Sequence, residues 1–475
     1  MKWFLILGIP LLMLSGCKES PKQFGVDLSS KSSNSLENIE SGFLEVPENR
    51  NIKNGKTIKL AYTVLKATGN NPKNDPILYL QGGPGGPTLV MESFWKNQEL
   101  RSDRDIVLMD QRGTGDSNAI CADLGTKFIE ILAMDLTSAE EYTKILGITN
   151  ECKKEAIEKE IDLSAYNSRE NAADFESLRK KLGYKQWNLM GGSYGSRLGL
   201  TIMRDFPNSV RSSVLFGIFG PDSDLYTNFI SSFSQSLLGT FEECRKDPDC
   251  NRQYPDLKTR FFDALKRLET DPIAFQYNGS EFVLNIQDVL LMAHQLLYRR
   301  NTIGFIPSFV IALENTDEEV LRQALRPTVI TTNFINLAMY MSVMAYEELP
   351  FNGAPEFLQD LEKNPHFSTG PAFFNSDAQI LENWHPFRAE NNENEPVISD
   401  IPALIANGSL DPITPTDNAL EVSKSLRKSY FLEFKREGHS LFNSCFFMIC
   451  REFLDHPKKR PDLSCATKNP KIQWN

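Results

Sequence analysis

Short apolar runs alternate with amphipathic segments over the first half of the chain. Ile58–Leu65 alternates apolar and polar residues as a half-buried strand does, whereas Pro76–Leu80 and Asp105–Met109 are continuous apolar runs bounded by loop residues. From the N-cap candidate Ser168, apolar residues recur at helical spacing until Gly183. Strands that alternate with helices predict an α/β protein, with a mostly parallel sheet covered by helices on both faces.

The pattern changes between residues 220 and 390, where consecutive helical segments replace the strand-like runs. Five segments have apolar residues at helical spacing: Phe229–Leu238, Leu257–Leu268, Ile286–Leu297, Glu318–Leu325 and Asn333–Ala345. Strand-like runs lie on either side of this stretch, at Val210–Phe216, Pro402–Ala406 and Tyr430–Phe434. Because the stretch is too long for a single crossover, we interpret it as a helical cap inserted over the C-terminal edge of the sheet.

This organisation divides the chain into five parts. We predict a signal peptide at residues 1–17, a flexible tether at 18–40, the first part of the core at 41–220, the cap at 221–390 and the second part of the core at 391–475.

The N-terminal segment resembles a bacterial lipoprotein signal. Lys2 supplies the positive charge, Trp3–Leu14 the apolar region, and Cys17 the thiol that would be lipidated. We therefore expect a protein anchored by lipid in the bacterial envelope, on the extracytoplasmic side. Lys18 follows the cysteine where an inner-membrane lipoprotein would carry aspartate, which favours the outer membrane in a diderm. The alternative is an ordinary secretory signal in which Cys17 occurs by chance.

Composition limits the partners. The 475 residues carry a net charge of −11, which excludes the basic face that nucleic-acid binding requires. No C-x-x-C pair or cluster of His and Cys suggests a metal, and we expect no cofactor. Eight cysteines occur, and in an oxidising compartment those beyond Cys17 can form disulfides. The favoured pairs are Cys121 with Cys152, Cys244 with Cys250, and Cys445 with Cys465, the last preferred over a pair that uses Cys450.

The candidate nucleophile is Ser193, within Gly191-Gly192-Ser193-Tyr194-Gly195. An apolar run precedes this pentapeptide and a helix-compatible segment follows it, which is the context of a nucleophile elbow. The flanking glycines permit the tight turn from strand to helix. The N-terminus of the following helix then favours the oxyanion that forms in acyl transfer.

A serine nucleophile needs a base and an acid that orients the base. Of the five histidines, His439 is the one that lies just after the last predicted strand, where it completes the chain order Ser, Asp, His. Asp411 follows the penultimate strand, 28 residues earlier, and is the best acid; the alternative is a turn aspartate before proline. The backbone N–H of Tyr194 would donate to the oxyanion, together with one from the glycine-rich loop Gln81–Gly86.

Several motifs together make the chain similar to the prolyl aminopeptidase and tripeptidyl aminopeptidase family of α/β-hydrolases. They are, in order, Gly82-Gly83-Pro84-Gly85, Asp110–Ser117, the serine pentapeptide, Asp411–Pro415 and Gly438-His439. The resemblance covers about residues 41 to 465 and implies an α/β-hydrolase fold and a serine exopeptidase that acts at peptide N-termini. It also implies Gly83 and Tyr194 as oxyanion donors. Gln81 stands where prolyl aminopeptidases usually carry histidine, which favours the tripeptidyl branch.

The resemblance also suggests an amine-binding residue. Tyr340–Pro350 is similar to a family segment whose glutamate lies near the active site, and we predict that Glu347 binds the substrate ammonium group. The alternative is an exposed glutamate at a helix end. Asp110–Ser117 is expected to brace the catalytic edge without touching substrate.

The expected function is therefore cleavage of short peptides by Ser193, His439 and Asp411, with the cap excluding folded proteins. A carboxylesterase or lipase would use the same three residues. A lipoprotein that binds peptides without catalysis is a further alternative.

Overall fold

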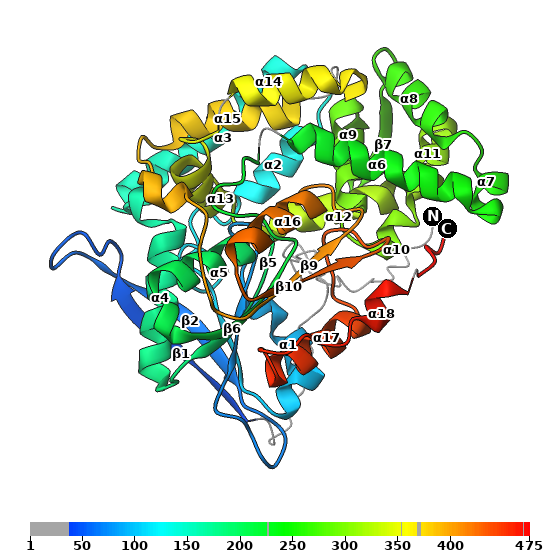
Figure 1. The fold of residues 1–475 in the computed structure, drawn as a ribbon. Coiled ribbons are helices and arrows are strands. Elements are labelled where there is room, and N and C mark those ends of the chain that lie inside the picture. Colours follow the sequence, from blue (N-terminus) through cyan, green and yellow to red (C-terminus); the bar gives the residue numbers. More distant parts are fainter. Residues whose placement is uncertain (1–37, 226–227, 353, 368–371, 469) are drawn as a thin grey trace, which may run out of the picture. The chain divides into compact units, whose positions relative to one another are not determined.

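An eight-stranded sheet organises the computed structural model, which describes residues 38–475 except 226–227, 353, 368–371 and 469. The strand order is β1-β2-β4-β3-β5-β6-β9-β10 (Figure 1). The strands are β1 Ile39–Pro47, β2 Thr57–Leu65, β3 Ile77–Leu80, β4 Ile106–Met109, β5 Trp187–Gly192, β6 Val210–Phe216, β9 Ala403–Gly408 and β10 Ser429–Phe434. β1 and β2 are antiparallel to their neighbours and the others pair in parallel, which confirms the predicted mostly parallel sheet.

Alternation along the strands gives the sheet two apolar faces. In β3, Ile77 and Tyr79 belong to a core cluster that also contains Trp95 of α1, whereas Leu78 and Leu80 belong to the cluster on the other face. Burial on both faces explains why β3 and β4 are continuous apolar runs. The helices of the core segments are α1 Glu92–Lys96, α2 Leu124–Leu132, α3 Ser138–Glu158, α4 Ser168–Leu182, α5 Tyr194–Asp205, α16 Thr416–Ser425, α17 Ser444–Asp455 and α18 Ser464–Thr467.

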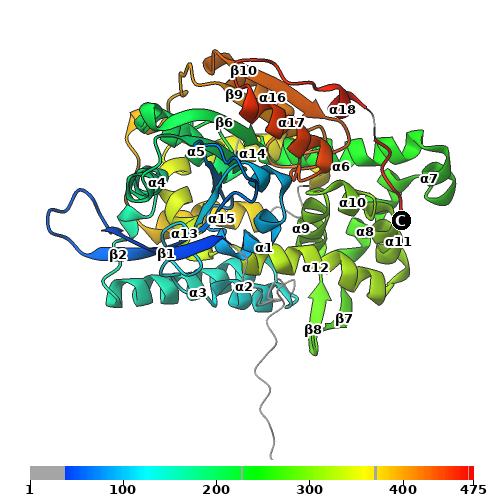
Figure 2. The ribbon, with the colours of Figure 1, turned by 90° about the horizontal axis from the view of Figure 1, so that it is seen from below.

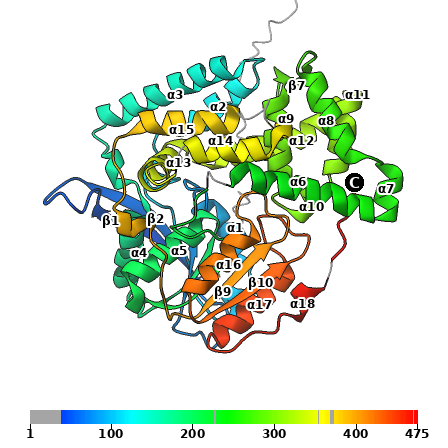
Figure 3. The same ribbon diagram turned by 45° about the horizontal axis from the view of Figure 1, so that its top comes forward.

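Between β6 and β9 the chain forms a helical cap, in the stretch where the sequence predicts one (Figures 2 and 3). Its elements are α6 Phe229–Lys246, α7 Pro248–Gln253, α8 Leu257–Leu268, β7 Ile273–Tyr277, β8 Ser280–Leu284, α9 Ile286–Leu296, α10 Arg300–Ile303, α11 Ile306–Asn315, α12 Glu318–Phe334, α13 Leu337–Val343, α14 Ala354–Lys363 and α15 Ala372–Trp384. A π-helical turn, Met344–Glu348, follows α13.

Two boundaries differ from the sequence prediction. The tether predicted at 18–40 ends earlier, because Ile39 and Glu40 already pair with Leu65 and Val64 at the start of β1. α2 and α3, which precede the elbow, pack against α12 and α15 and so extend the cap layer (Figure 3). The signal peptide, Cys17 and the tether up to residue 37 lie outside the described residues.

Three disulfides fasten loops and helix ends. They join Cys121 to Cys152, Cys244 to Cys250 and Cys445 to Cys465, the pairs expected from the sequence, while Cys450 is buried as a free thiol.

No single helix among the described residues has both the length and the apolarity to cross a membrane. α12 together with the segment Leu337–Glu348, bent by 69°, meets those criteria as a pair.

Glu141 of α3 makes stability depend on pH. Its side chain is buried and burial raises its pKa from 4.5 to about 7. Between these values the folded state binds a proton that the unfolded chain has released, so the free energy of unfolding falls as pH rises from about 4.5 to 7. The loss is on the order of 3 kcal/mol.

We therefore expect Glu141→Gln to remove this loss. In denaturant titrations the variant should unfold with about the wild-type free energy at pH 4 and with a higher free energy at pH 8. Glu151→Gln, an exposed glutamate of the same helix, is the matched control and should leave the pH dependence unchanged. Equal values for wild type and Glu141→Gln at pH 8 would contradict the assignment.

Candidate active site

The turn from β5 to α5 holds Ser193 in an unusual backbone conformation. Its φ is 55° and its ψ is −131°. A Cβ atom on Gly191 would lie 2.2 Å from the carbonyl oxygen of Gly195, and one on Gly195 would lie 2.1 Å from that of Leu80. Only glycine fits at these two positions, and the turn places Ser193 at the N-terminus of α5.

His439 and Asp411 form a buried hydrogen-bonded pair. Nδ1 of His439 donates to Oδ2 of Asp411 over 2.8 Å, and the two residues are 8% and 4% exposed. Asp411 also accepts hydrogen bonds from the backbone N–H groups of Ile413 and Thr414. These bonds fix the carboxylate, and the carboxylate fixes the imidazole tautomer with Nδ1 protonated and Nε2 able to accept a proton.

Thr414 is a member of the site that the sequence analysis did not assign. Its hydroxyl donates to Oδ2 of Asp411 over 2.7 Å and lies 3.1 Å from Nδ1 of His439. The only available signal was its place in the Asp411–Pro415 motif. A side chain that contacts both partners restricts rotation of the carboxylate and of the ring.

Phe216 and Gly217, at the end of β6, lie between Ser193 and His439. The backbone N–H of Ser193 donates to the carbonyl of Phe216 over 3.0 Å. A Cβ on the next residue, Gly217, would lie 2.9 Å from Cε1 of His439. The two candidate residues therefore contact consecutive positions of the same turn, and only a glycine leaves room for the imidazole ring there.

The glycine-rich loop after β3 packs directly against Ser193. A Cβ on Gly82 would lie 3.0 Å from Cβ of Ser193 and 3.6 Å from its hydroxyl oxygen. The next residue, Gly83, has a φ of 134°. Within the described part of the chain, neither Gly83 N–H nor Tyr194 N–H donates a hydrogen bond to another residue. Both groups are thus available to an oxyanion.

Glu347 lies in a buried ionic network, so the alternative of an exposed helix-end glutamate does not hold. It is 4% exposed and accepts hydrogen bonds from the backbone N–H and hydroxyl of Ser168 and from Nε of Arg197. The hydroxyl of Ser168 in turn contacts that of Tyr194 over 2.8 Å. The network therefore joins the π-helical turn of the cap to the residue that follows Ser193.

Glu348 adds a second carboxylate to this network. It pairs with the same arginine, Arg197, and burial raises its pKa to about 8. Two buried carboxylates thus share one guanidinium group, and the raised pKa reflects the cost of a second negative charge there.

The Asp110–Ser117 loop has the bracing contacts expected of it. Asp110 accepts hydrogen bonds from the backbone N–H groups of Thr88 and Asp116, and Arg112 pairs with buried Asp174 over 2.8 Å. Gln111 of the same loop donates to the carbonyl of Gln81 over 2.8 Å, which fixes the start of the glycine-rich loop.

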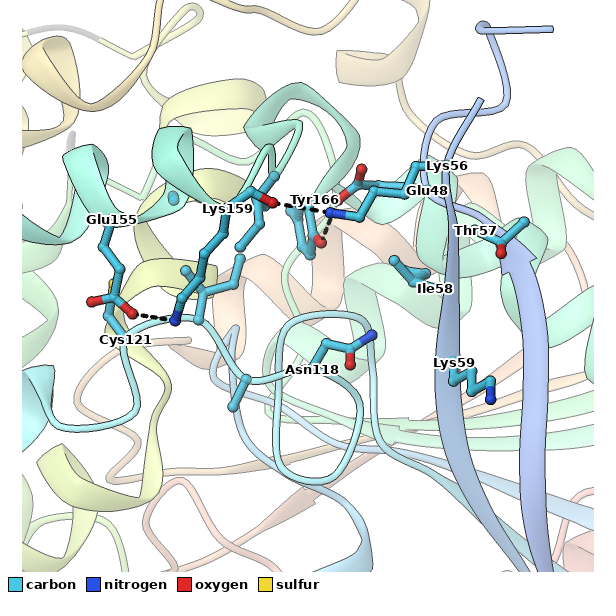
Figure 4. A pocket seen from close by; sticks show the side chains of 14 residues that line it. Glu48, Lys56, Thr57, Ile58, Lys59, Asn118, Cys121, Glu155, Lys159 and Tyr166 are labelled. Atoms are coloured by element: carbon cyan, nitrogen blue, oxygen red, sulfur yellow. Dashed lines mark hydrogen bonds and ion pairs between the residues drawn. The ribbon is translucent and has the colours of Figure 1, made fainter. Parts of the chain in front are cut away.

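A separate cavity of about 490 Å³ lies between the β1–β2 hairpin and the end of α3. Figure 4 shows Lys56 pointing toward the end of α3 and Lys159 toward Glu155. Its lining includes none of the three candidate catalytic residues. Among the described residues, no group of three His, Cys, Asp or Glu side chains could hold a metal ion.

Comparison with known proteins supports the α/β-hydrolase fold. A family model described as the α/β hydrolase fold matches residues 75–251, and one described as TAP-like protein matches residues 371–465. The tripeptidyl aminopeptidase of Streptomyces lividans is 28% identical over 197 residues, which cover 39% of this chain and only 36% of that protein. The proline iminopeptidase of Xanthomonas citri is 23% identical over 382 residues, covering 78% of this chain and 85% of that protein.

Among solved structures, an esterase from Thermogutta terrifontis aligns over 88% of this chain and 100% of its own. The sequence identity is 13% and the TM-score is 0.40.

Substitutions should distinguish the roles of the residues at the candidate site. A fluorophosphonate reagent modifies an activated serine, so we expect Ser193→Ala to abolish labelling. His439→Ala should slow it by roughly 10²–10⁴-fold, since a general base contributes about that much. His456→Ala, which removes an exposed histidine, should label at the wild-type rate. Wild-type labelling of Ser193→Ala would show that the reactive serine lies elsewhere.

Proposed function

Since the chain is an α/β-hydrolase whose sequence is similar to tripeptidyl aminopeptidases and proline iminopeptidases, we propose that it is a serine exopeptidase. It would hydrolyse short peptides from their free N-terminus. The observation that carries the proposal is the buried Asp411–His439 hydrogen bond beside the turn that holds Ser193. A serine, a base and an oriented acid are the groups that acyl transfer requires.

The reaction would follow from these positions. The Ser193 hydroxyl attacks the scissile carbonyl while Nε2 of His439 takes its proton. The N–H groups of Gly83 and Tyr194 bind the oxyanion of the tetrahedral intermediate. His439 then gives the proton to the departing amine, and the acyl group remains on Ser193. Water, deprotonated by His439, hydrolyses the acyl-enzyme and restores the serine.

Recognition of a free N-terminus requires a negative group in the substrate cavity. Glu347 and Glu348 share one arginine, and the raised pKa of about 8 keeps Glu348 largely protonated at neutral pH. An ammonium group bound here would favour loss of that proton, and the resulting carboxylate would balance its charge. The hydrogen bonds that Glu347 accepts from Ser168 and Arg197 orient its carboxylate. We assign the amine-binding role to Glu347, with Glu348 as its neighbour in the charge balance.

A matched set of substrates tests the peptidase assignment. Tripeptidyl and prolyl nitroanilides with a free amine should be cleaved, and their N-acetylated forms should be cleaved at least tenfold more slowly. Glu347→Gln should raise KM for the free-amine substrates by roughly 10- to 150-fold, because a hydrogen bond to a charged group contributes about 1.5–3 kcal/mol. It should leave turnover of p-nitrophenyl acetate nearly unchanged.

Cleavage of the ester alone, with no amide product, would favour the carboxylesterase alternative. Failure to react with any substrate or fluorophosphonate would favour the peptide-binding lipoprotein. Equal cleavage of free and acetylated peptides would contradict recognition of the amine.

The protein would act on the extracytoplasmic side of a bacterial envelope, anchored through lipid on Cys17. This proposal rests on the sequence of residues 1–17, and the three disulfides suit an oxidising compartment. The membrane and short peptides are then its only proposed partners.

Lipid attachment predicts a simple change in fractionation. Wild-type protein expressed in a bacterium should appear in the membrane fraction and partition into detergent, because acyl chains bury apolar area in the bilayer. The Cys17→Ser variant should not incorporate labelled palmitate, because it lacks the thiol that would be lipidated. Labelled palmitate on the Cys17→Ser variant would exclude this cysteine as the anchor.

A further inference from the structure

The cap contacts the loop that carries His439 through its backbone. This loop, residues 435–443, connects β10 to α17 and is called the His loop below. The N–H of Ser440 donates to the carbonyl of Tyr298, just after α9, over 2.8 Å. A Cβ on Gly438 would lie 1.9 Å from the carbonyl oxygen of Leu297, so no side chain fits between cap and loop there.

Two ion pairs hold the same loop on either side of this contact. Glu437, beside Gly438, pairs with Arg300 of α10 over 3.1 Å and accepts a hydrogen bond from Asn443. Arg436 pairs with Glu243 of α6. Three cap segments therefore hold the His loop: residues 297–298, α10 and α6. These contacts are separate from those that His439 itself makes.

Tyr298 then contacts the imidazole. Its ring centroid lies 5.0 Å from that of His439, and the two ring planes meet at 63°. Tyr298 is half-buried, and desolvation of its hydroxyl raises the pKa of that group, so Tyr298 stays neutral. The groups around the imidazole thus include the Asp411 carboxylate and the Thr414 hydroxyl at Nδ1, the Gly217 backbone near Cε1, and the Tyr298 ring.

A cluster of aromatic side chains packs against Tyr298 and holds its ring beside His439. The ring of His294 in α9 lies 5.5 Å from that of Tyr298, and the rings of Phe229 and Phe233 each lie 5.6 Å from His294. Burial lowers the pKa of His294 to about 3, with the nearby charge of His439 as a second cause. His294 is therefore neutral at the pH at which a peptidase works, and it adds no positive charge beside the catalytic imidazole.

We propose that Tyr298 is a positioning residue through which the cap holds the His439 imidazole against Asp411 and Gly217. This inference rests on the proposed catalytic role of His439. When His439 takes the serine proton it becomes an imidazolium whose charge is balanced by Asp411. An apolar ring beside this pair excludes water, which keeps the hydrogen bond in a low local dielectric, and it prevents the imidazole from rotating away from Asp411.

Variants that differ in the ring alone test the proposal. Tyr298→Phe keeps the ring and should label with fluorophosphonate within about twofold of wild type. Tyr298→Leu loses the ring, and its labelling rate and kcat should fall by about tenfold or more with KM nearly unchanged, because Tyr298 acts through His439. The low-field proton NMR resonance of the His439 Nδ1–H should persist in Tyr298→Phe and broaden in Tyr298→Leu.

Tyr254→Leu is the matched control, since Tyr254 is a buried cap tyrosine whose hydroxyl contacts Ser308, and it should retain the wild-type rate and resonance. If Tyr298→Leu does not fold, Tyr298→Met refills the volume without a planar ring and takes its place. Wild-type labelling and an unchanged resonance in the folded ring-less variant would overturn the proposal. Because labelling and NMR need no peptide, failure of the wild type to cleave peptides would refute the proposed function without deciding the role of Tyr298.

Discussion

The close approach of backbone to backbone at the β5–α5 turn is the constraint on which the rest of the site depends. Gly191 and Gly195 touch each other and the end of β3 at distances that exclude any Cβ atom. This contact forces Ser193 into its left-handed conformation and brings the glycine-rich loop after β3 against it. The positions of the candidate nucleophile, of one candidate oxyanion donor and of the helix N-terminus thus follow from a single packing contact, and a methyl group at either glycine would separate them.

The cap belongs to the catalytic apparatus as much as the core does. It contacts each loop that carries a candidate residue: Asn336 donates to Gly85 of the glycine-rich loop, Ser236 to Leu410 beside the acid, and Tyr298 accepts from Ser440 beside the base. These contacts couple the geometry of the site to the stability of the cap, because loops between strand ends and helices have little packing of their own.

Buried charge provides the second connection between cap and core. Arg197 of α5 pairs with Glu347 and Glu348 of the cap, and Ser168 extends this network to Tyr194. A buried ion pair of this kind contributes little net stability but is costly to break, so it favours one arrangement of the cap over others. If Glu347 binds the ammonium group of a peptide, as proposed above, orientation of the cap and recognition of substrate would depend on the same side chain.

The sequence by itself determined the alternation of strands and helices in the core, the inserted cap, the elbow around Ser193 and the choice of Asp411 and His439 as its candidate partners. It could do so because periodicity and turn glycines are local, and because the carboxyl ends of parallel strands meet at one edge of the sheet. Only the tertiary structure decided that Tyr298, Thr414 and Gly217 contact His439, and that Glu347 is bound by Ser168 and Arg197, which are 179 and 150 residues away. It also decided that the long helix α3 and the β7–β8 hairpin belong to the cap layer, neither of which the apolar pattern predicted. Such contacts depend on how the cap packs on the core, and no local pattern of residues records that packing.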